Sequence, residues 1–168
     1  MEENSRKLKF FSDFYARAAT PEGWICKSDI QLEVFASVAA NMILLKRERD
    51  DWVFTLIGTG IVEEYRRDFT GFSVQEIPHD ECRTLYRETI EKTSTHVRPF
   101  EIRGDFCCAD GNFIKASEIS VPLSEDGQSV THVLILCVLD RSDKTMKLYD
   151  DEKRHDSFSY SIEPLPLA

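Results

Sequence analysis

The segment from Val130 to Leu139 limits the fold more than any other part of the chain, because it is apolar at nearly every position. A strand of an antiparallel sheet with one face in water alternates apolar and polar residues, and this segment does not alternate. If it is a strand, both of its faces must be covered by protein. We expect one cover to be either an N-terminal helix or a second subunit.

The N-terminal residues provide a candidate for this cover. Apolar residues, most of them aromatic, recur every three or four positions from Leu8 to Ala18. This spacing predicts a helix over residues 5–20 with one large apolar face. Such a face must be buried on its own domain or on a partner chain. We therefore expect a homodimer that forms through this helix.

The remaining residues predict an α+β domain. Expected helices cover residues 30–39, 61–67 and 81–94, and expected strands cover residues 42–46, 52–57, 98–107, 112–122 and 130–139. Asp110-Gly111 is typical of a hairpin turn, and Asp80 can cap the third of these helices. The predicted organisation is an N-terminal amphipathic helix in residues 1–23, one domain in residues 24–142 and a flexible C-terminal tail in residues 143–168.

Composition restricts the function classes. The chain has 168 residues and a net charge of −9, with 30 acidic against 21 basic residues, which disfavours binding to nucleic acid. We expect no membrane segment, because no stretch of about 20 apolar residues occurs. There is no secretory signal, and the five scattered cysteines are typical of free thiols in a reducing compartment, so we expect a cytoplasmic protein.

Several short motifs resemble those of one known family. Residues 52–59 look like a strand followed by a Gly-Thr signature, residues 64–71 are similar to the motif after it, and residues 27–30 match the start of the first domain helix. The positions that fit the last strands are Pro99, Arg103-Gly104, Asp110-Gly111, Glu118 and residues 122–127. Together, over residues 24–140, they resemble PAS-like domains, in particular a bacterial stand-alone PAS subfamily formerly known as a domain of unknown function.

The resemblance implies a five-stranded antiparallel sheet with helices packed on one face and, in this chain, an extra N-terminal helix. One position departs from the family pattern, which usually has Gly where Arg66 stands. A glycine there would allow a positive φ angle at the end of a helix. With Arg66 in its place, we expect that the helix either continues or ends differently.

The resemblance also implies a sensory or interaction module rather than an enzyme. PAS domains mostly detect small molecules, bind cofactors, or dimerise and pass a signal to an effector. No effector segment fits in the residues outside the domain. We therefore expect a module that binds a small apolar or aromatic ligand or a regulatory protein partner and signals through dimerisation or docking.

An apolar pocket between the central helices and the sheet is the expected site. The residues predicted to line it are Phe54, Leu56, Val62, Tyr65, Phe69, Leu85, Tyr86, Glu118 and Leu134. The same pattern also fits a plain hydrophobic core without a ligand. Glu118 could equally be an exposed carboxylate or one paired with Arg103. The alternative function is a small-molecule enzyme with Glu118 as general base and Tyr65 or Tyr86 as acid.

No metal or cofactor is assigned from the sequence. The four histidines do not have the spacing of a zinc site, and His79 and His96 flank the predicted helix of residues 81–94 instead of lying inside it, which disfavours haem. Cys107-Cys108 would point to opposite faces of a strand and so would not readily hold one metal together. The glycines at 58 and 60 lack the lysine and spacing of a phosphate-binding loop.

Overall fold

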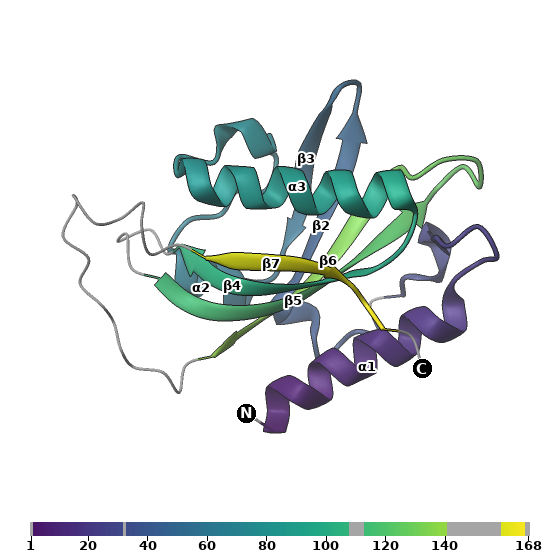
Figure 1. Ribbon diagram of the computed structural model, residues 1–168, viewed down its shortest axis with the longest axis horizontal. Helices are drawn as coiled ribbons and strands as arrows, with labels where there is room; N and C mark the ends of the chain where they lie inside the picture. Colours follow the sequence, from purple (N-terminus) through teal and green to yellow (C-terminus); the bar gives the residue numbers. More distant parts are fainter. Residues whose placement is uncertain (1, 32, 108–112, 141–158, 167–168) are drawn as a thin grey trace.

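The computed structural model describes residues 2–31, 33–107, 113–140 and 159–166 (Figure 1). Its α-helices are α1 (Glu2–Ala18), α2 (Thr59–Tyr65) and α3 (Asp80–His96), with short 3-10 helices at Lys27–Asp29, Ala39–Asn41 and Val74–Glu76. Its strands are β1 (Ile25–Cys26), β2 (Met42–Glu48), β3 (Asp51–Ile57), β4 (Phe100–Cys107), β5 (Phe113–Ser124), β6 (His132–Asp140) and β7 (Tyr160–Pro164). None of the described helices is long and apolar enough to span a membrane.

The strands form one sheet, and the predicted α+β class is confirmed. The strand order is β3-β2-β6-β5-β4-β7, and neighbouring strands along it are antiparallel. The expected number of five strands is wrong, because β7 extends the sheet beyond β4 and β1 adds a short parallel pairing with β5. The helices α2 and α3 lie in the chain between β3 and β4, where the PAS-like arrangement places its helices.

Strand β6 lies at the centre of the sheet and is covered on both faces. Eight of its nine residues are buried, as the lack of alternation in this segment predicts. One face packs against the cluster under α2 and α3, which includes Ile135 and Cys137. The other face packs against the cluster under α1, which includes Leu134 and Leu136. Figure 1 shows α1 and α3 on opposite sides of the sheet.

The helix α1 buries its aromatic face on its own chain. Phe11 is 1% exposed and Tyr15 is 3% exposed, and the Tyr15 hydroxyl donates a hydrogen bond of 2.7 Å to the carbonyl oxygen of Gly23. Of the two covers expected for the central strand, the structure therefore contains the helix. The homodimer stays a prediction, but the aromatic face of α1 no longer supports it.

The expected helix over residues 30–39 is wrong. Residues 33–38 form turns, followed by the 3-10 helix Ala39–Asn41. The ring of Phe35 packs edge-on against three aromatic rings of α1, with the nearest centroid, that of Phe14, 4.8 Å away. Val34, in the same turns, is 45% exposed. The contacts of Phe35 with the rings of α1 therefore decide the conformation of this short segment, although its apolar residues have helical spacing.

Part of the expected flexible tail belongs to the sheet. Tyr160–Pro164 pairs with β4, and Ile162 is buried beside Leu85 and Phe100. The two strands approach closely at Gly104, where an added Cβ atom would lie 2.6 Å from the Cβ atom of Tyr160. The described residues do not include residues 143–158 of the expected tail or the Asp110-Gly111 turn. Of the Cys107-Cys108 pair, they include Cys107 alone.

Arg66 ends α2 in the left-handed conformation, which is the one expected for the glycine usual at this position in the PAS-like subfamily that the sequence resembles. Its φ is 57° and its ψ is 23°, and its backbone N–H donates a 2.7 Å hydrogen bond to the carbonyl oxygen of Val62. The helix therefore stops where a glycine would stop it. A non-glycine residue in this conformation costs roughly 1–2 kcal/mol. The cap of α3 also differs from expectation, since His79 and not Asp80 occupies the N-cap position.

Replacing Arg66 with glycine is expected to stabilise the domain. Relief of the left-handed strain outweighs the extra entropy that glycine has in the unfolded chain, which leaves a gain of about 0.5–1 kcal/mol. Urea unfolding followed by circular dichroism measures this change. The control is Glu63→Gly, an exposed position inside the same helix, which should destabilise by about 1 kcal/mol. If Arg66→Gly and Glu63→Gly lowered the free energy of unfolding equally, the role assigned to Arg66 would be wrong.

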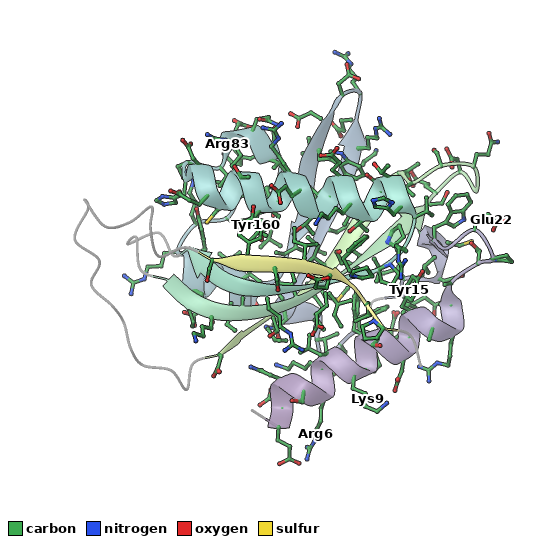
Figure 2. All side chains as sticks on the ribbon, in the orientation of Figure 1. Arg6, Lys9, Tyr15, Glu22, Arg83 and Tyr160 are labelled. Atoms are coloured by element: carbon green, nitrogen blue, oxygen red, sulfur yellow. The ribbon has the colours of Figure 1, made fainter. Side chains whose placement is uncertain are left out.

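Truncating Phe11 is expected to destabilise the domain strongly. Phe11→Ala removes a buried ring from the face that covers β6 and should cost about 3–5 kcal/mol in the free energy of unfolding. Lys9→Ala, on the solvent side of the same helix (Figure 2), should cost about 0.5 kcal/mol or less, because it removes only the exposed pair with Asp13. A small effect of Phe11→Ala would mean that α1 does not pack on the sheet in solution.

Candidate functional site

A cavity lies between the sheet and the helices α2 and α3. Its volume is about 50 Å³. A water molecule requires roughly 10–15 Å³ in such a measure, so the cavity has room for about three or four waters or a ligand with few atoms. It is far smaller than the sites of about 300–1,000 Å³ that hold drug-sized molecules.

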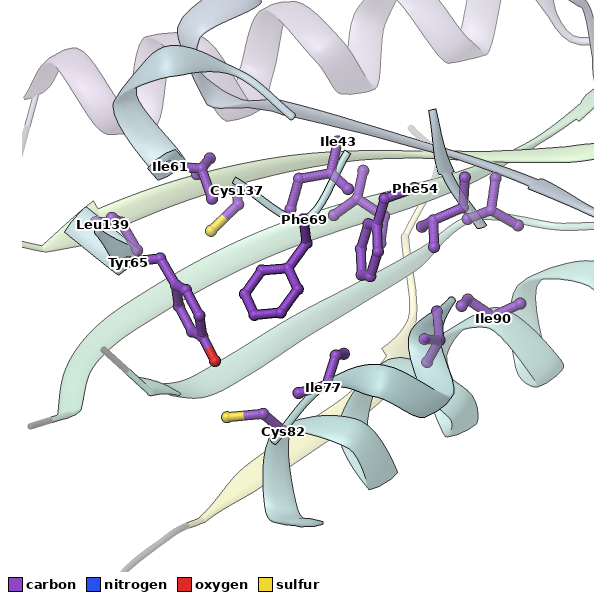
Figure 3. Packing of buried hydrophobic residues seen from close by; sticks show 14 of the residues in the cluster. Ile43, Phe54, Ile61, Tyr65, Phe69, Ile77, Cys82, Ile90, Cys137 and Leu139 are labelled. Atoms are coloured by element: carbon purple, nitrogen blue, oxygen red, sulfur yellow. The ribbon is translucent and has the colours of Figure 1, made fainter. Parts of the chain in front are cut away.

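Six of the nine predicted residues line this cavity. They are Phe54, Tyr65, Phe69, Leu85, Tyr86 and Glu118. Figure 3 shows the rings of Phe54, Tyr65 and Phe69 pointing into the space between the sheet and α3. Whether they bind a ligand stays a prediction, but the structure does bring them together.

The other three predicted residues do not line the cavity. Leu56 and Leu134 belong to the cluster under α1, on the opposite face of the sheet. Val62 is half-buried on α2, and its neighbour Ile61 lines the cavity instead. Leu134 was assigned to the wrong face because both faces of β6 are apolar, so the sequence gives no sign of which residues point to which side.

A β-bulge explains the position of Leu56. Leu45 pairs with Phe54 and Leu44 pairs with Leu56, so Thr55 is an extra residue without a partner position in β2. In a regular strand, positions 54 and 56 would share a face. The bulge shifts the alternation by one residue, so that Leu56 turns away and Ile57 joins Phe54 at the cavity.

The aromatic side chains of the site pack edge to face. The ring centroids of Phe54 and Tyr86 are 5.6 Å apart, and those of Tyr65 and Phe69 are 5.0 Å apart. The guanidinium carbon of Arg67 lies 4.6 Å from the ring centroid of Phe69. These contacts form a wall of rings that come from β3, α2, α3 and the segment after α2.

Glu118 provides the carboxyl group of this wall. It is 5% exposed, and its register partner in β6 is Cys137, whose thiol donates a hydrogen bond to the carboxylate. Burial raises the pKa of Glu118 to about 7, and the thiol hydrogen bond opposes this rise only in part. The alternative expectation of an exposed carboxylate, or one paired with Arg103, is wrong. Arg103 binds Glu101 instead.

Two neighbouring groups are held in their neutral forms. Burial and the nearby Glu118 carboxyl raise the pKa of the Tyr86 hydroxyl and of the Cys137 thiol well above their usual values. Cys82, on α3, also lines the cavity. Sequence reasoning missed both cysteines, although the pairing of Cys137 with Glu118 follows once the register of β5 and β6 is known.

The described residues contain no group of three or more His, Cys, Asp or Glu side chains placed to hold a metal ion. The described cysteines Cys26, Cys82 and Cys137 are not in disulfide bonds. The apolar wall and the single carboxyl of the cavity are therefore the features on which a function must be argued.

No protein-family model and no curated protein sequence matches the chain. Among solved structures it is similar to VqmA bound to DPO, with 12% identity, a TM-score of 0.47, and coverage of 66% of this chain and 58% of that chain. It is also similar to VqmA in a Vibrio cholera complex with a ligand and DNA, with 14% identity, a TM-score of 0.46, and coverage of 66% and 51%. The match thus spans little more than half of those chains, and similarity at this level carries no argument about function.

The buried carboxyl of Glu118 makes a testable contribution to stability. The pKa of about 7 in the folded protein exceeds the ordinary value of 4.5, so the folded state holds its proton more tightly than the unfolded state. This contribution is complete below pH 4.5 and is lost as the pH rises towards 7. Each pKa unit corresponds to 1.36 kcal/mol. The difference between 4.5 and about 7 therefore lowers the free energy of unfolding by about 3 kcal/mol over this pH range.

Urea unfolding of wild type and Glu118→Gln between pH 4 and 8 measures this loss. The glutamine side chain does not titrate, so the variant should gain about 3 kcal/mol relative to wild type across this range. Glu125→Gln, in the exposed turn before β6, is the control and should follow wild type. If the free energy of unfolding changed with pH in the same way for wild type and Glu118→Gln, Glu118 would not be buried in the folded protein.

Proposed function

We propose that this chain is a PAS-like sensory module that binds a small molecule in the cavity beneath α2 and α3. The observation that carries the proposal is a small apolar cavity with one buried carboxyl at its wall. Ligand sites combine mostly apolar linings with a few placed polar groups that fix orientation. A core built for stability alone gains nothing from a carboxyl whose burial is unfavourable.

The sheet offers a route from the cavity to the other face of the domain. Cys137 contacts Glu118 on the cavity side, while its neighbours Leu136 and Val138 pack in the cluster beneath α1. A ligand that displaces this part of β6 also moves the surface on which α1 rests. Close-packed interiors transmit such displacements. We propose that the position of α1 reports ligand binding to a partner protein or to a second copy.

A second contact links the cavity helix to the sheet. The hydroxyls of Thr93 on α3 and Ser120 on β5 are 2.7 Å apart and buried. Ser120 lies two residues from Glu118 on the same strand. A shift of α3 on ligand binding is therefore communicated directly to β5.

The other parts of the proposal follow from charge and sequence. The net charge of −9 disfavours a nucleic acid as the partner and favours a protein or a small molecule. We propose a cytoplasmic module of the bacterial stand-alone PAS type, on the motifs around residues 52–59 and 64–71. The five scattered cysteines support a reducing compartment.

The same site supports a second candidate less well. A pKa of about 7 suits Glu118 as a general base. The proton donor expected beside it is weak, because the pKa of Tyr86 is raised well above its usual value. We therefore propose binding without catalysis. Consumption of a small molecule by wild type, and not by Glu118→Gln, would reverse this preference.

Filling the cavity is expected to abolish ligand binding. Ala116→Leu adds three carbon atoms at the cavity wall, more than a space of about 50 Å³ can share with a ligand. Native mass spectrometry of the protein mixed with a concentrated small-molecule extract of cells should show a bound small molecule on wild type and none on this variant. Ser117→Leu, at the next position on β5 and on the opposite side of the strand, is the control and should retain it. A wild-type protein that binds no small molecule in the presence of this concentrated extract would contradict the proposal.

A further inference from the structure

Among the residues that the structure describes, the buried carboxyl of Glu118 has no cationic partner. None of the ion pairs among the described residues includes it. Of the cationic side chains in the described part of the chain, only Arg67 lines the cavity, and its guanidinium lies over the rings of Phe69 and Phe72. Buried carboxylates are normally paired with a positive charge or neutralised by a proton.

The walls around Glu118 suit a positive charge. The cavity is bordered by the aromatic rings of Phe54, Tyr65, Phe69 and Tyr86. Aromatic faces attract cations, more strongly when water is excluded. Arg67, itself part of the cavity lining, contacts Phe69, which shows that one of these rings already attracts a cation.

We infer that the ligand of this cavity is a small organic cation, an alkylammonium of about four non-hydrogen atoms, whose ammonium group pairs with the Glu118 carboxylate among the aromatic rings. This inference rests on the proposed function and names the class of its ligand. The volume of about 50 Å³ sets the size. The affinity ceiling for so few atoms lies in the tens of micromolar.

Binding of such a cation is coupled to a proton. The titratable or charged groups around Glu118 are its neighbours Cys137 on β6 and Tyr86 on α3, together with the cavity-lining residues Cys82, Tyr65 and Arg67. The raised pKa values of Tyr86 and Cys137 keep these two groups neutral at pH 6–8, whereas the pKa of Glu118 lies inside this range. Glu118 must lose its proton before it can pair with an ammonium group.

The direction of the pH dependence follows. With a pKa of about 7, roughly one tenth of Glu118 is ionised at pH 6 and roughly nine tenths at pH 8. An alkylammonium, like a lysine side chain, keeps its charge throughout this range. The affinity for an alkylammonium should therefore rise about tenfold from pH 6 to pH 8. The affinity for a neutral ligand of the same shape should not rise with pH.

The test uses n-propylammonium chloride and its neutral counterpart 1-propanol, titrated into the full chain and followed by ¹H–¹⁵N NMR. For wild type we expect shifts at the cavity residues with n-propylammonium, about tenfold tighter at pH 8 than at pH 6, and much weaker shifts with 1-propanol. Glu118→Gln should lose n-propylammonium binding at least tenfold and keep its weak affinity for 1-propanol, which shows that its cavity is intact. Phe69→Leu should weaken n-propylammonium several-fold and leave 1-propanol unchanged.

The outcomes separate this inference from the proposed function. Binding of 1-propanol as tight as that of n-propylammonium, or tighter, leaves a ligand-binding cavity and overturns the cationic ligand. Binding of n-propylammonium that is unchanged in Glu118→Gln, or the same at pH 6 and 8, also overturns it. If neither compound binds, the cation inference fails, and the ligand found by native mass spectrometry decides the proposed function independently.

Discussion

The burial of β6 on both faces is the constraint on which the rest of the structure depends. An apolar central strand cannot leave either side in water, so one layer of helices must pack on each face of the sheet. On one side this layer is α1, with Phe11 and Tyr15 as its anchors. On the other side it is α2 and α3, and the incomplete filling between them and the sheet leaves the cavity beside Glu118.

The parts of this arrangement that depend on local pattern could be predicted from the sequence. The amphipathic spacing of α1 and the missing alternation in β6 both act within a few residues. The importance of Glu118 could be anticipated only through the family resemblance, because the sequence alone fits an exposed carboxylate equally well. Its surroundings could not, because the choice between Arg103 and Cys137 as its neighbour depends on the register of three strands.

The errors arose where one residue changes the geometry or where distant residues decide it. The extra residue Thr55 reverses the faces of Leu56 and Ile57, and nothing in its identity marks a bulge. The segment 30–39 has helical spacing, but Phe35 is held in a turn by rings that lie more than twenty positions earlier. Strand β7 forms because the edge of β4 and Gly104 accept it, which is a property of the partner strand.

The contact between the two ends of the described chain has a mechanical consequence. Leu165, just after β7, is buried in the same cluster as Phe11 and Tyr15 of α1. If α1 lifts from the sheet, it uncovers Leu165, and if β7 peels from β4, it removes a residue on which α1 rests. A protease that cuts at one end, or a force applied there, will therefore loosen the other end as well, although β7 and α1 lie at opposite ends of the sequence.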